Sequence, residues 1–391
     1  MLTPNAMTAA RRRRVAIDLR YVRGRVSGVL PYMLALIDRL PALAPDLDFL
    51  FVRHPDAERT PLSPAVNVRE VVFPHVPCGP ATMWGMRWML DLRGVDVFHA
   101  TFNLLPVGLA MPTVTTIFDT MWIEHPEWVR VRGAWGRFVE GPFMAHGMRR
   151  AIDHSTRIAA GSDATRDDIV RLSPEAAART RVTWLGVGGR FRPARSDDDH
   201  HAAERARERF VPGARRYVLT VGQYAPYKNH ESVVRAFAHA FAHDRDTHLV
   251  FVQRRGEGRD RLTRLASSLG VGDRVHLLRD LGFDELVALH WGAALLCHPS
   301  ICEGFGNPPA EAMAAGCPVV TSDRSPMREI GGDAALLVDP LDPRAIGAAM
   351  RRVMADASLA GSMRQRGIAQ AARFSWQRTA ETTLAVYREL L

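Results

Sequence analysis

Short apolar runs rich in β-branched residues alternate along the whole chain with longer amphipathic segments. This alternation is typical of βα units built around parallel sheets, and it restricts the possible folds more than any other feature. In the first half, the expected strands are Val15–Leu19, Phe49–Val52, Val66–Val72, Asp96–Ala100, Thr113–Phe118, Arg157–Ala160 and Val182–Leu185. In the second half, they are Tyr217–Val221, His248–Gln253, Arg274–Leu278, Ala293–Leu296, Pro318–Thr321 and Ala334–Val338. Because such continuous apolar runs lie in the centre of a sheet, the pattern predicts an α/β fold.

The length of 391 residues predicts two domains, and a Gly-, Pro- and Asp-rich segment near the middle separates them. We expect a Rossmann-like domain over residues 1–190, a linker over 191–214, a second Rossmann-like domain over 215–374 and a terminal segment over 375–391. Ligands of open parallel sheets bind beyond the carboxyl ends of the strands. A substrate cleft is therefore expected between the two domains.

Composition excludes several classes of protein. Hydrophobic residues make up 47% and charged residues 24%, as in an ordinary soluble globular protein. The four cysteines, Cys78, Cys297, Cys302 and Cys317, form no CxxC pair and no Cys/His spacing, so we expect reduced thiols and no metal site. No apolar run approaches ~18 residues, which favours a cytoplasmic protein. The net charge of +9 is spread over both halves, unlike that of a nucleic-acid binder.

The segment CHPSICEGFGNPPAE predicts a strand, a glycine-rich turn and a helix. We expect Asn307 to cap that helix, with Pro308 at its first position. Gly304 and Gly306 allow a close backbone approach, and the free amides of the first turn offer an anion site. Glu303 in the loop and Glu311 in the first turn are expected to face one pocket. The alternative is a solvated loop with a glutamate that complements the helix dipole.

Lys228 is the single lysine among 51 basic residues, and it lies in the turn VGQYAPYKN. A strand enters this turn and Asn229 is expected to cap the next helix, so the ammonium suits a diphosphate; the alternative is an exposed lysine without a role. A third turn, GRVSGVLPYML, places Ser27 and Gly28 before a helix with Pro31 in its first turn. No GxGxxG fingerprint occurs anywhere, which argues against a dinucleotide cofactor.

These motifs resemble those of a known family. EGFGNPPAEAMAAGCPVV, with two glutamates eight positions apart, resembles the donor-site signature of the GT-B retaining glycosyltransferases of family 4 (glycosyltransferase group 1). VGQYAPYKN resembles the family's VG…PRKN turn, and SDRSPMREIGGDAALLVDPLD resembles the segment that follows the signature. SGVLPYM, VDVFHAT, TTIFDTMWIEHPEW and LGVGGRFRP are similar to family segments in the same order, so the resemblance spans nearly the whole chain.

The resemblance implies a two-domain GT-B fold, with an N-terminal acceptor-binding domain, a C-terminal nucleotide-sugar-binding domain and a last helix that crosses back. It implies transfer of a hexose from a nucleotide-sugar donor, with retention and with neither a metal nor another cofactor. Mannose from GDP-mannose is favoured over UDP-sugars. The expected acceptor is a saccharide or polyprenyl-linked saccharide of O-antigen, capsule or exopolysaccharide synthesis.

The resemblance also assigns roles by motif. Glu303 contacts donor-sugar hydroxyls, Glu311 the ribose and Leu281 the base, while Gly28 approaches the diphosphate from the first domain. Lys228 neutralises the diphosphate with amides of the donor loop. The expected donor-binding residues are Gly28, Gln223, Lys228, Leu281, Glu303, Gly304, Phe305, Gly306, Asn307 and Glu311, and the expected catalytic residues are Glu303, Lys228, His99 and Asp119.

Two positions depart from the family pattern. Phe118 precedes Asp119 where many relatives carry a histidine, so either His99 or His125 replaces it, the acceptor differs, or activity is weak. Gln223 and Tyr227 stand where many relatives carry arginines, which leaves more of the phosphate charge to Lys228.

Other functions stay open at this point. A sugar-nucleotide epimerase would use the same cleft without an acceptor. A pyridoxal-phosphate phosphorylase would need Lys228 for its Schiff base, and a catalytically weak nucleotide-sugar-binding protein is the third alternative.

Two segments, Ala81–Arg93 and Glu127–Arg150, mix Trp, Met, Phe and Arg. They form either core helices or a face that contacts the inner side of the cytoplasmic membrane.

Overall fold

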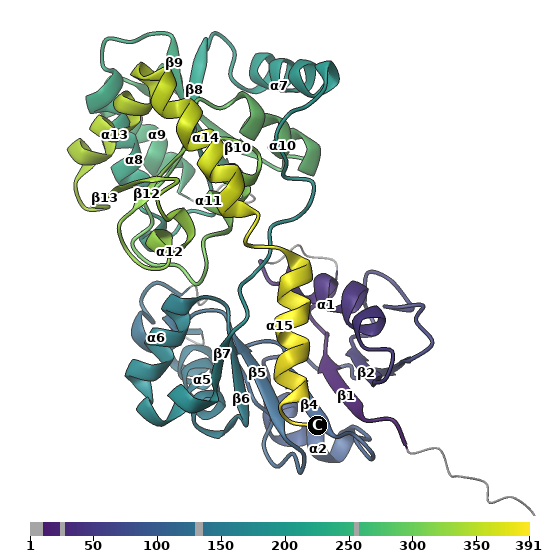
Figure 1. Cartoon of the computed structure of the whole chain (residues 1–391). Helices are drawn as coiled ribbons and strands as arrows, with labels where there is room; N and C mark the ends of the chain where they lie inside the picture. The colour runs from purple at the N-terminus through teal and green to yellow at the C-terminus, as the bar shows by residue number, and fades with distance from the viewer. Residues whose placement is uncertain (1–10, 24–27, 130–135, 254–257) are drawn as a thin grey trace, which may run out of the picture.

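The computed structural model describes residues 11–23, 28–129, 136–253 and 258–391. Within these residues the chain forms a seven-stranded sheet in the order β3-β2-β1-β4-β5-β6-β7 and a six-stranded sheet in the order β10-β9-β8-β11-β12-β13. The pairs between neighbouring strands are parallel; β1, for example, pairs with β2 on one side and β4 on the other. The expected α/β fold with two Rossmann-like sheets is confirmed (Figure 1).

Every expected strand is present, with ends that differ by at most about three residues. The first sheet contains β1 (Arg14–Asp18), β2 (Asp48–Arg53), β3 (Val68–Val72), β4 (Val97–Ala100), β5 (Thr113–Ile117), β6 (Arg157–Ala160) and β7 (Thr180–Val182). The second contains β8 (Arg216–Val221), β9 (Thr247–Gln253), β10 (Val275–Arg279), β11 (Leu295–His298), β12 (Val319–Ser322) and β13 (Leu336–Val338). The largest shift is in β7, whose expected range is Val182–Leu185. The central strands β4, β5, β9, β11 and β12 are buried at every residue, as their continuous apolar runs predict.

Helices connect the strands in both domains. In the first domain they are α1 (Leu30–Leu43), α2 (Met86–Met89), α3 (Met121–Glu124), α5 (Gly141–His154) and α6 (Asp163–Leu172). In the second they are α8 (His230–Phe241), α9 (Arg259–Ser268), α10 (Phe283–Gly292), α11 (Asn307–Ala314), α12 (Met327–Gly331), α13 (Pro343–Ala355) and α14 (Ala357–Ala371). Among the described residues, no helix has both the length and the apolar character that crossing a membrane requires.

The segment between the sheets is more ordered than a linker. Residues 191–214 contain α7 (Asp197–Phe210), which begins with a capping box between Ser196 and Asp199 and packs against α10. Most of this segment is thus part of the second domain's helical layer.

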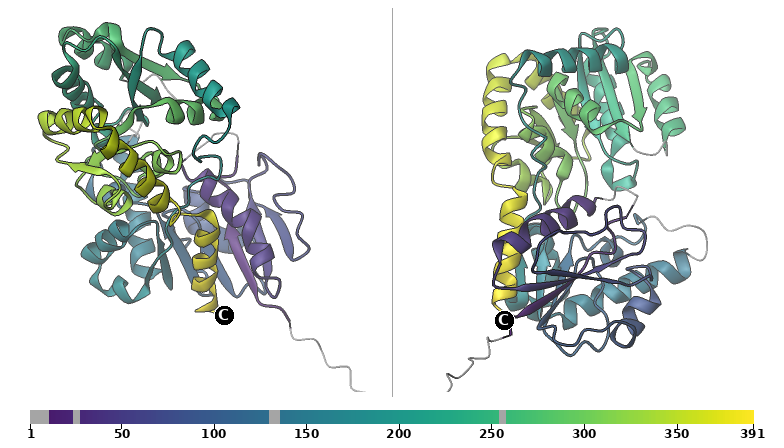
Figure 2. Two further views of the ribbon diagram at one scale, coloured as in Figure 1. Left: turned by 45° about the horizontal axis from the view of Figure 1, so that its top comes forward. Right: turned by 90° about the vertical axis from the view of Figure 1, so that its right-hand side faces the viewer.

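The last helix, α15 (Trp376–Arg388), follows α14 but packs against α1 of the first domain. Figures 1 and 2 show it in yellow, leaving the upper domain and running along the lower one. The chain therefore passes between the domains twice, before α7 and before α15. The carboxyl ends of the two sheets are in contact. The hydroxyl of Ser162, which follows β6, donates a hydrogen bond to the carbonyl of Gly304, which follows β11.

Candidate active site

Lys228 ends a short 3₁₀ turn, Pro226–Lys228, that follows β8. Gly222, next after the strand, has a φ of +146°, a conformation that favours glycine, and a Cβ there would lie 3.7 Å from the Lys228 side chain. Asn229 precedes α8 as expected, but its side chain does not cap the helix. Its amide donates instead to the carbonyls of Pro299 and Pro340. The turn is thereby held against the loop after β11, which carries Glu303.

Lys228 and Glu303 form an ion pair, with Nζ 2.5 Å from Oε1 and side chains 12% and 10% exposed. The Ser300 hydroxyl donates to the same oxygen at 2.8 Å, and His298 Nε2 lies 3.1 Å from it. Burial alone would raise the pKa of Glu303, but the Lys228 ammonium and His298 outweigh it and lower the pKa to about 2. Among the described residues, only Glu303 accepts a hydrogen bond from the ammonium. Two of its three N–H groups are therefore available to a ligand.

The glycine-rich loop can offer backbone N–H groups to a ligand. Within the described chain, no hydrogen bond uses the amides of Gly304, Phe305, Gly306 or Asn307. The first turn of α11 adds little, because Pro308 and Pro309 carry no N–H. Successive loop amides of this kind form an anion-binding concavity.

Two predictions for this segment are wrong. Gly306, not Asn307, occupies the N-cap of α11. This position requires glycine, because its φ is +109° and a Cβ there would lie 2.2 Å from Met327 Cε. Glu311 is the fifth residue of the helix, so it is half-buried in the second turn rather than the first. The Phe305 side chain is buried and packs edge-on against Phe374, which leaves only its backbone for a ligand.

Asp119 follows β5 and faces this loop from the first domain. Burial, together with the negative charges of Glu303 and Asp168, raises the pKa of its carboxyl to about 6, against a 3.0 Å hydrogen bond from the Met121 amide. A Cβ on Gly304 would lie 2.2 Å from the Phe118 carbonyl oxygen and 3.2 Å from Asp119 Cβ. The structure thus brings Lys228, Glu303, Gly304 and Asp119 together where the two domains meet.

His99 does not belong to this group. It is fully buried on β4, with Nδ1 2.6 Å from the Tyr387 hydroxyl and Nε2 2.8 Å from the Thr116 hydroxyl. Burial lowers its pKa to about 3, so the ring is neutral. Nε2 bonds β5 of the same sheet and Nδ1 bonds α15, so both ring nitrogens have partners inside the protein, and the catalytic role expected of His99 stays a prediction.

His125, the other histidine considered, lies near the Lys228 turn. Its ring stacks on that of Trp128, with 3.8 Å between the ring centres. The Trp128 ring centre in turn lies 6.2 Å from that of Tyr227 in the Lys228 turn. The Lys228 ammonium lies 5.4 Å from the centre of the Tyr227 ring. An aromatic group from both domains (His125, Trp128 and Tyr227) therefore stands next to the ion pair.

The remaining predicted residues lie around this centre. Gln223 comes directly after Gly222 and is half-buried, and Leu281 follows β10 two strands from β8. A Cβ on Gly28, just before α1, would meet no atom within 4 Å. Ser27 lies outside the described residues. Within the described parts of the chain, no three His, Cys, Asp or Glu side chains are arranged to hold a metal ion.

Sequence reasoning missed four residues at this site. His298 and Ser300 support Glu303, and both stand in the motif that identified it, so the signal was present. Ser162 and Thr165, at the start of α6, hold Gly304 from the other domain. They stand 142 and 139 residues from Gly304, and no local pattern joins such distant segments.

The sequence model of the family described as glycosyl transferases group 1 matches residues 203–371. The chain is 30% identical over 314 residues to an O-antigen chain mannosyltransferase B of Escherichia coli, covering 78% of this chain and 77% of that protein. It is 32% identical over 255 residues to a D-inositol 3-phosphate glycosyltransferase of Salinispora arenicola, covering 62% of this chain and 57% of that protein.

Solved structures with lower identity share the fold. Sucrose-phosphate synthase from Thermosynechococcus elongatus superimposes with a TM-score of 0.71 at 19% identity, over 97% of this chain and 99% of that chain. Anabaena HepE, in complex with UDP and glucose, does so with a TM-score of 0.70 at 17% identity, over 96% of this chain and 100% of that chain. The family match, the relative that aligns over about three quarters of both chains, and the fold agree: the protein belongs to the glycosyl transferases group 1 family and has the GT-B fold.

Proposed function

We propose that this protein is a retaining, metal-independent hexosyltransferase that moves mannose from GDP-mannose to a saccharide or lipid-linked saccharide in cell-surface polysaccharide synthesis. The observation that carries the proposal is the Lys228–Glu303 pair, which lies beside the amides of residues 304–307 and opposite Asp119 of the other domain; no described residue accepts a hydrogen bond from those amides. Positive charge, free N–H donors and carboxylates are thus gathered at one interface.

In the proposed mechanism the second domain binds the donor. Lys228 and the loop amides accept the diphosphate and stabilise the negative charge that grows on it as the sugar departs. Glu303 stays ionised because of its low pKa, so it accepts hydrogen bonds from donor-sugar hydroxyls. Glu311 is assigned to the ribose. These fixed charges meet the demand that a metal ion would otherwise meet, and unchanged rates in EDTA are expected.

The first domain is assigned to the acceptor. The acceptor hydroxyl attacks the face from which the diphosphate leaves, and a diphosphate oxygen takes its proton, which gives retention. Asp119, with a pKa of about 6, is placed to accept a hydrogen bond from the incoming hydroxyl. The rings of Trp128 and His125 offer the apolar face that a sugar ring covers.

The choice of mannose rests on the mannosyltransferase relative, which aligns over most of both chains. UDP-sugars are the second choice, since the HepE structure of the same fold holds UDP and glucose. A panel of nucleotide sugars compared by thermal shift separates them, because the matched donor raises the unfolding temperature by mass action.

We also propose that the first domain contacts an anionic membrane surface. Trp84, Trp88 and Met89 in Ala81–Arg93, and Phe138 and Val139 in Glu127–Arg150, are exposed, with Trp88 70% and Phe138 73% accessible. Residues 130–135 of the second segment lie outside the described chain. Arg87 stacks on Trp88 at 3.8 Å, which pairs a cation with an apolar ring at the surface. In flotation with anionic liposomes, the wild type should be recovered with the liposomes and Trp88→Ser should not. Equal recovery of the two proteins would contradict the proposed membrane contact.

The deciding experiment incubates the protein with GDP-mannose and an α-mannoside acceptor, with and without EDTA, and follows GDP release and the anomeric configuration of the product. An α-linked product and EDTA-insensitive release support the proposal. An epimer formed from the donor alone favours the epimerase. Donor binding without hydrolysis or transfer to any acceptor favours the weak binding protein.

A further inference from the structure

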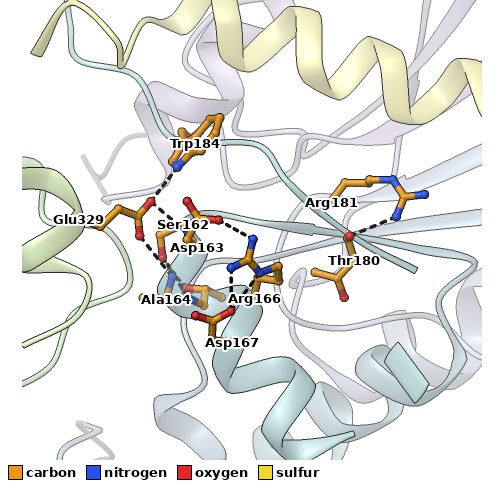
Figure 3. Close-up of polar contacts among 10 residues, drawn as sticks. Ser162, Asp163, Ala164, Arg166, Asp167, Thr180, Arg181, Trp184 and Glu329 are labelled. Carbon is orange, nitrogen blue, oxygen red and sulfur yellow. Dashed lines mark hydrogen bonds and ion pairs between the residues drawn. The ribbon is translucent and has the colours of Figure 1, made fainter. Parts of the chain in front are cut away.

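A carboxylate from the second domain caps a helix of the first. Glu329 on α12 accepts hydrogen bonds from the amides of Asp163 at 3.1 Å and Ala164 at 3.2 Å, the first two residues of α6. The Trp184 indole donates to the same carboxylate at 2.7 Å. Figure 3 shows Glu329 reaching to the start of α6, with Trp184 on the other side of the carboxylate. A negative charge at this end of a helix is stabilising, because unbonded N–H groups point outward there.

The same end of α6 holds the donor loop in return. The Ser162 hydroxyl donates to the Gly304 carbonyl at 2.6 Å. The Thr165 hydroxyl lies 3.0 Å from the Phe118 carbonyl and 3.1 Å from that of Gly304, so one hydrogen is shared between the two domains. The contacts between α6 and the second domain are therefore reciprocal. Glu329 of the second domain caps α6, and the start of α6 donates hydrogen bonds to the Gly304 carbonyl of the donor loop.

Holding the Gly304 carbonyl orients a donor group. The peptide bond between Gly304 and Phe305 is planar and trans, so its N–H points away from its C=O. The hydroxyls of Ser162 and Thr165 therefore aim the Phe305 amide away from α6. That amide has no hydrogen-bond partner among the described residues.

The loop is also supported from behind by the helix that carries Glu329. Met327, two residues before Glu329, packs so closely on Gly306 that a Cβ there would lie 2.2 Å from its Cε. One short helix thus contacts both the loop and α6. A shift of α12 relative to α6 would move Gly306 and release the Gly304 carbonyl together.

We infer that Glu329, Ser162 and Thr165 are positioning residues that align the Phe305 amide with the leaving diphosphate only when the two domains are docked. This inference rests on the proposed function, since it names how that site is completed. Lys228 and the rest of the second domain hold the donor in the ground state and in the transition state alike, while the hydrogen bond from the aligned amide strengthens as charge develops on the departing diphosphate. Loss of the contact should therefore lower kcat and leave the donor KM nearly unchanged.

The test compares Glu329→Gln with Glu285→Gln. In the first variant the amide oxygen can keep the donors Asp163 and Trp184, but its NH₂ group faces the Ala164 amide, so the negative charge and one hydrogen bond are lost without a change of shape. Glu285 is a matched control, because it accepts a hydrogen bond from the Gly282 amide at the start of α10 within one domain. We expect Glu329→Gln to lower kcat for GDP release about tenfold or more, with donor KM within about twofold, while Glu285→Gln changes neither. Equal kcat in the two variants overturns the inference.

Thr165→Val provides a second variant, because it removes only a hydroxyl and leaves α12 intact. It should also lower kcat, and hydrogen exchange in peptides covering 303–314 should rise in both Thr165→Val and Glu329→Gln. Exchange unchanged in both variants overturns the inference even where the fold is kept. If the wild type acts on no nucleotide sugar, the proposed function fails, and the exchange measurement still decides whether α6 holds the loop.

Discussion

The two domains use the same strand ends in different ways. In the first domain β1 ends at Asp18, whose carboxylate pairs with Arg20 in an ion pair that is nearly inaccessible. Arg20 also donates to the His75 carbonyl and the Thr82 hydroxyl, so most of its N–H groups are satisfied by the protein. In the second domain the equivalent central strand, β8, leads to Lys228, which has one hydrogen-bond acceptor among the described residues and two N–H groups to spare.

The difference distinguishes the structural Asp18–Arg20 pair from the Lys228–Glu303 pair, which we propose to bind the diphosphate. A buried ion pair whose donors are mostly satisfied holds loops in place, whereas a pair with spare donors at a domain interface can bind an anion. The same contrast holds for histidines: His99 bonds the first sheet to α15, and His298 supports the Glu303 carboxylate that pairs with Lys228.

The largest expected effect removes the spare donors. Lys228→Met keeps the aliphatic chain next to Gly222 but removes the charge, so we expect kcat to fall about 10²–10³-fold, as when an oxyanion donor is lost. Steady-state GDP release measures it, and an unfolding curve checks the fold. Near-normal turnover would show that Lys228 is as structural as Arg20.

A second effect tests the domain contact. Gly304→Ala would place a Cβ 2.2 Å from the Phe118 carbonyl, so the domains cannot dock closely and kcat should fall about tenfold or more. Gly361→Ala on α14 is the matched control, because nothing lies within 4 Å of its Cβ position. Equal rates in both variants would mean that the close approach of Gly304 to Phe118 is not needed for turnover.

A smaller effect belongs to the first domain alone. Tyr387→Phe leaves buried His99 Nδ1 without its partner, which should destabilise the protein by about 1–3 kcal/mol. Urea unfolding measures this loss. Because no donor-binding residue is touched, GDP affinity should stay constant, and a parallel loss of affinity would contradict the separation of roles.

The smallest effect is a pH dependence of the second domain. His248 Nδ1 lies 2.8 Å from His276 Nε2, and burial, with the neighbouring His248, lowers the pKa of His276 to about 4. As the pH falls, His276 takes up a proton in the unfolded chain, where its pKa is about 6.5, before it does so in the folded protein. The free energy of unfolding therefore falls as the pH drops from about 6.5 to 4. His276→Gln should make this decline shallower when unfolding temperature is followed against pH. Identical slopes in the wild type and the variant would show that the His248–His276 pair does not cause the decline.

Much of the fold and part of the site follow from sequence because their determinants are local. Continuous apolar runs locate all thirteen strands of the described sheets, and Lys228 and Glu303 stand in short motifs next to strand ends. The contacts that sequence does not predict join residues far apart along the chain. The partner of His99 Nδ1 could not be found from its motif, because Tyr387 is 288 residues away. The contact of Glu329 with α6 spans 166 residues to Asp163.

The central proposal is that the cleft binds a nucleotide sugar through Lys228, Glu303 and the loop amides. A crystal structure of the complex with GDP-mannose tests it most directly. We predict diphosphate oxygens within hydrogen-bond distance of Lys228 Nζ and the Phe305 amide, with the hexose against Glu303. A nucleotide bound with its diphosphate away from Lys228 would contradict it.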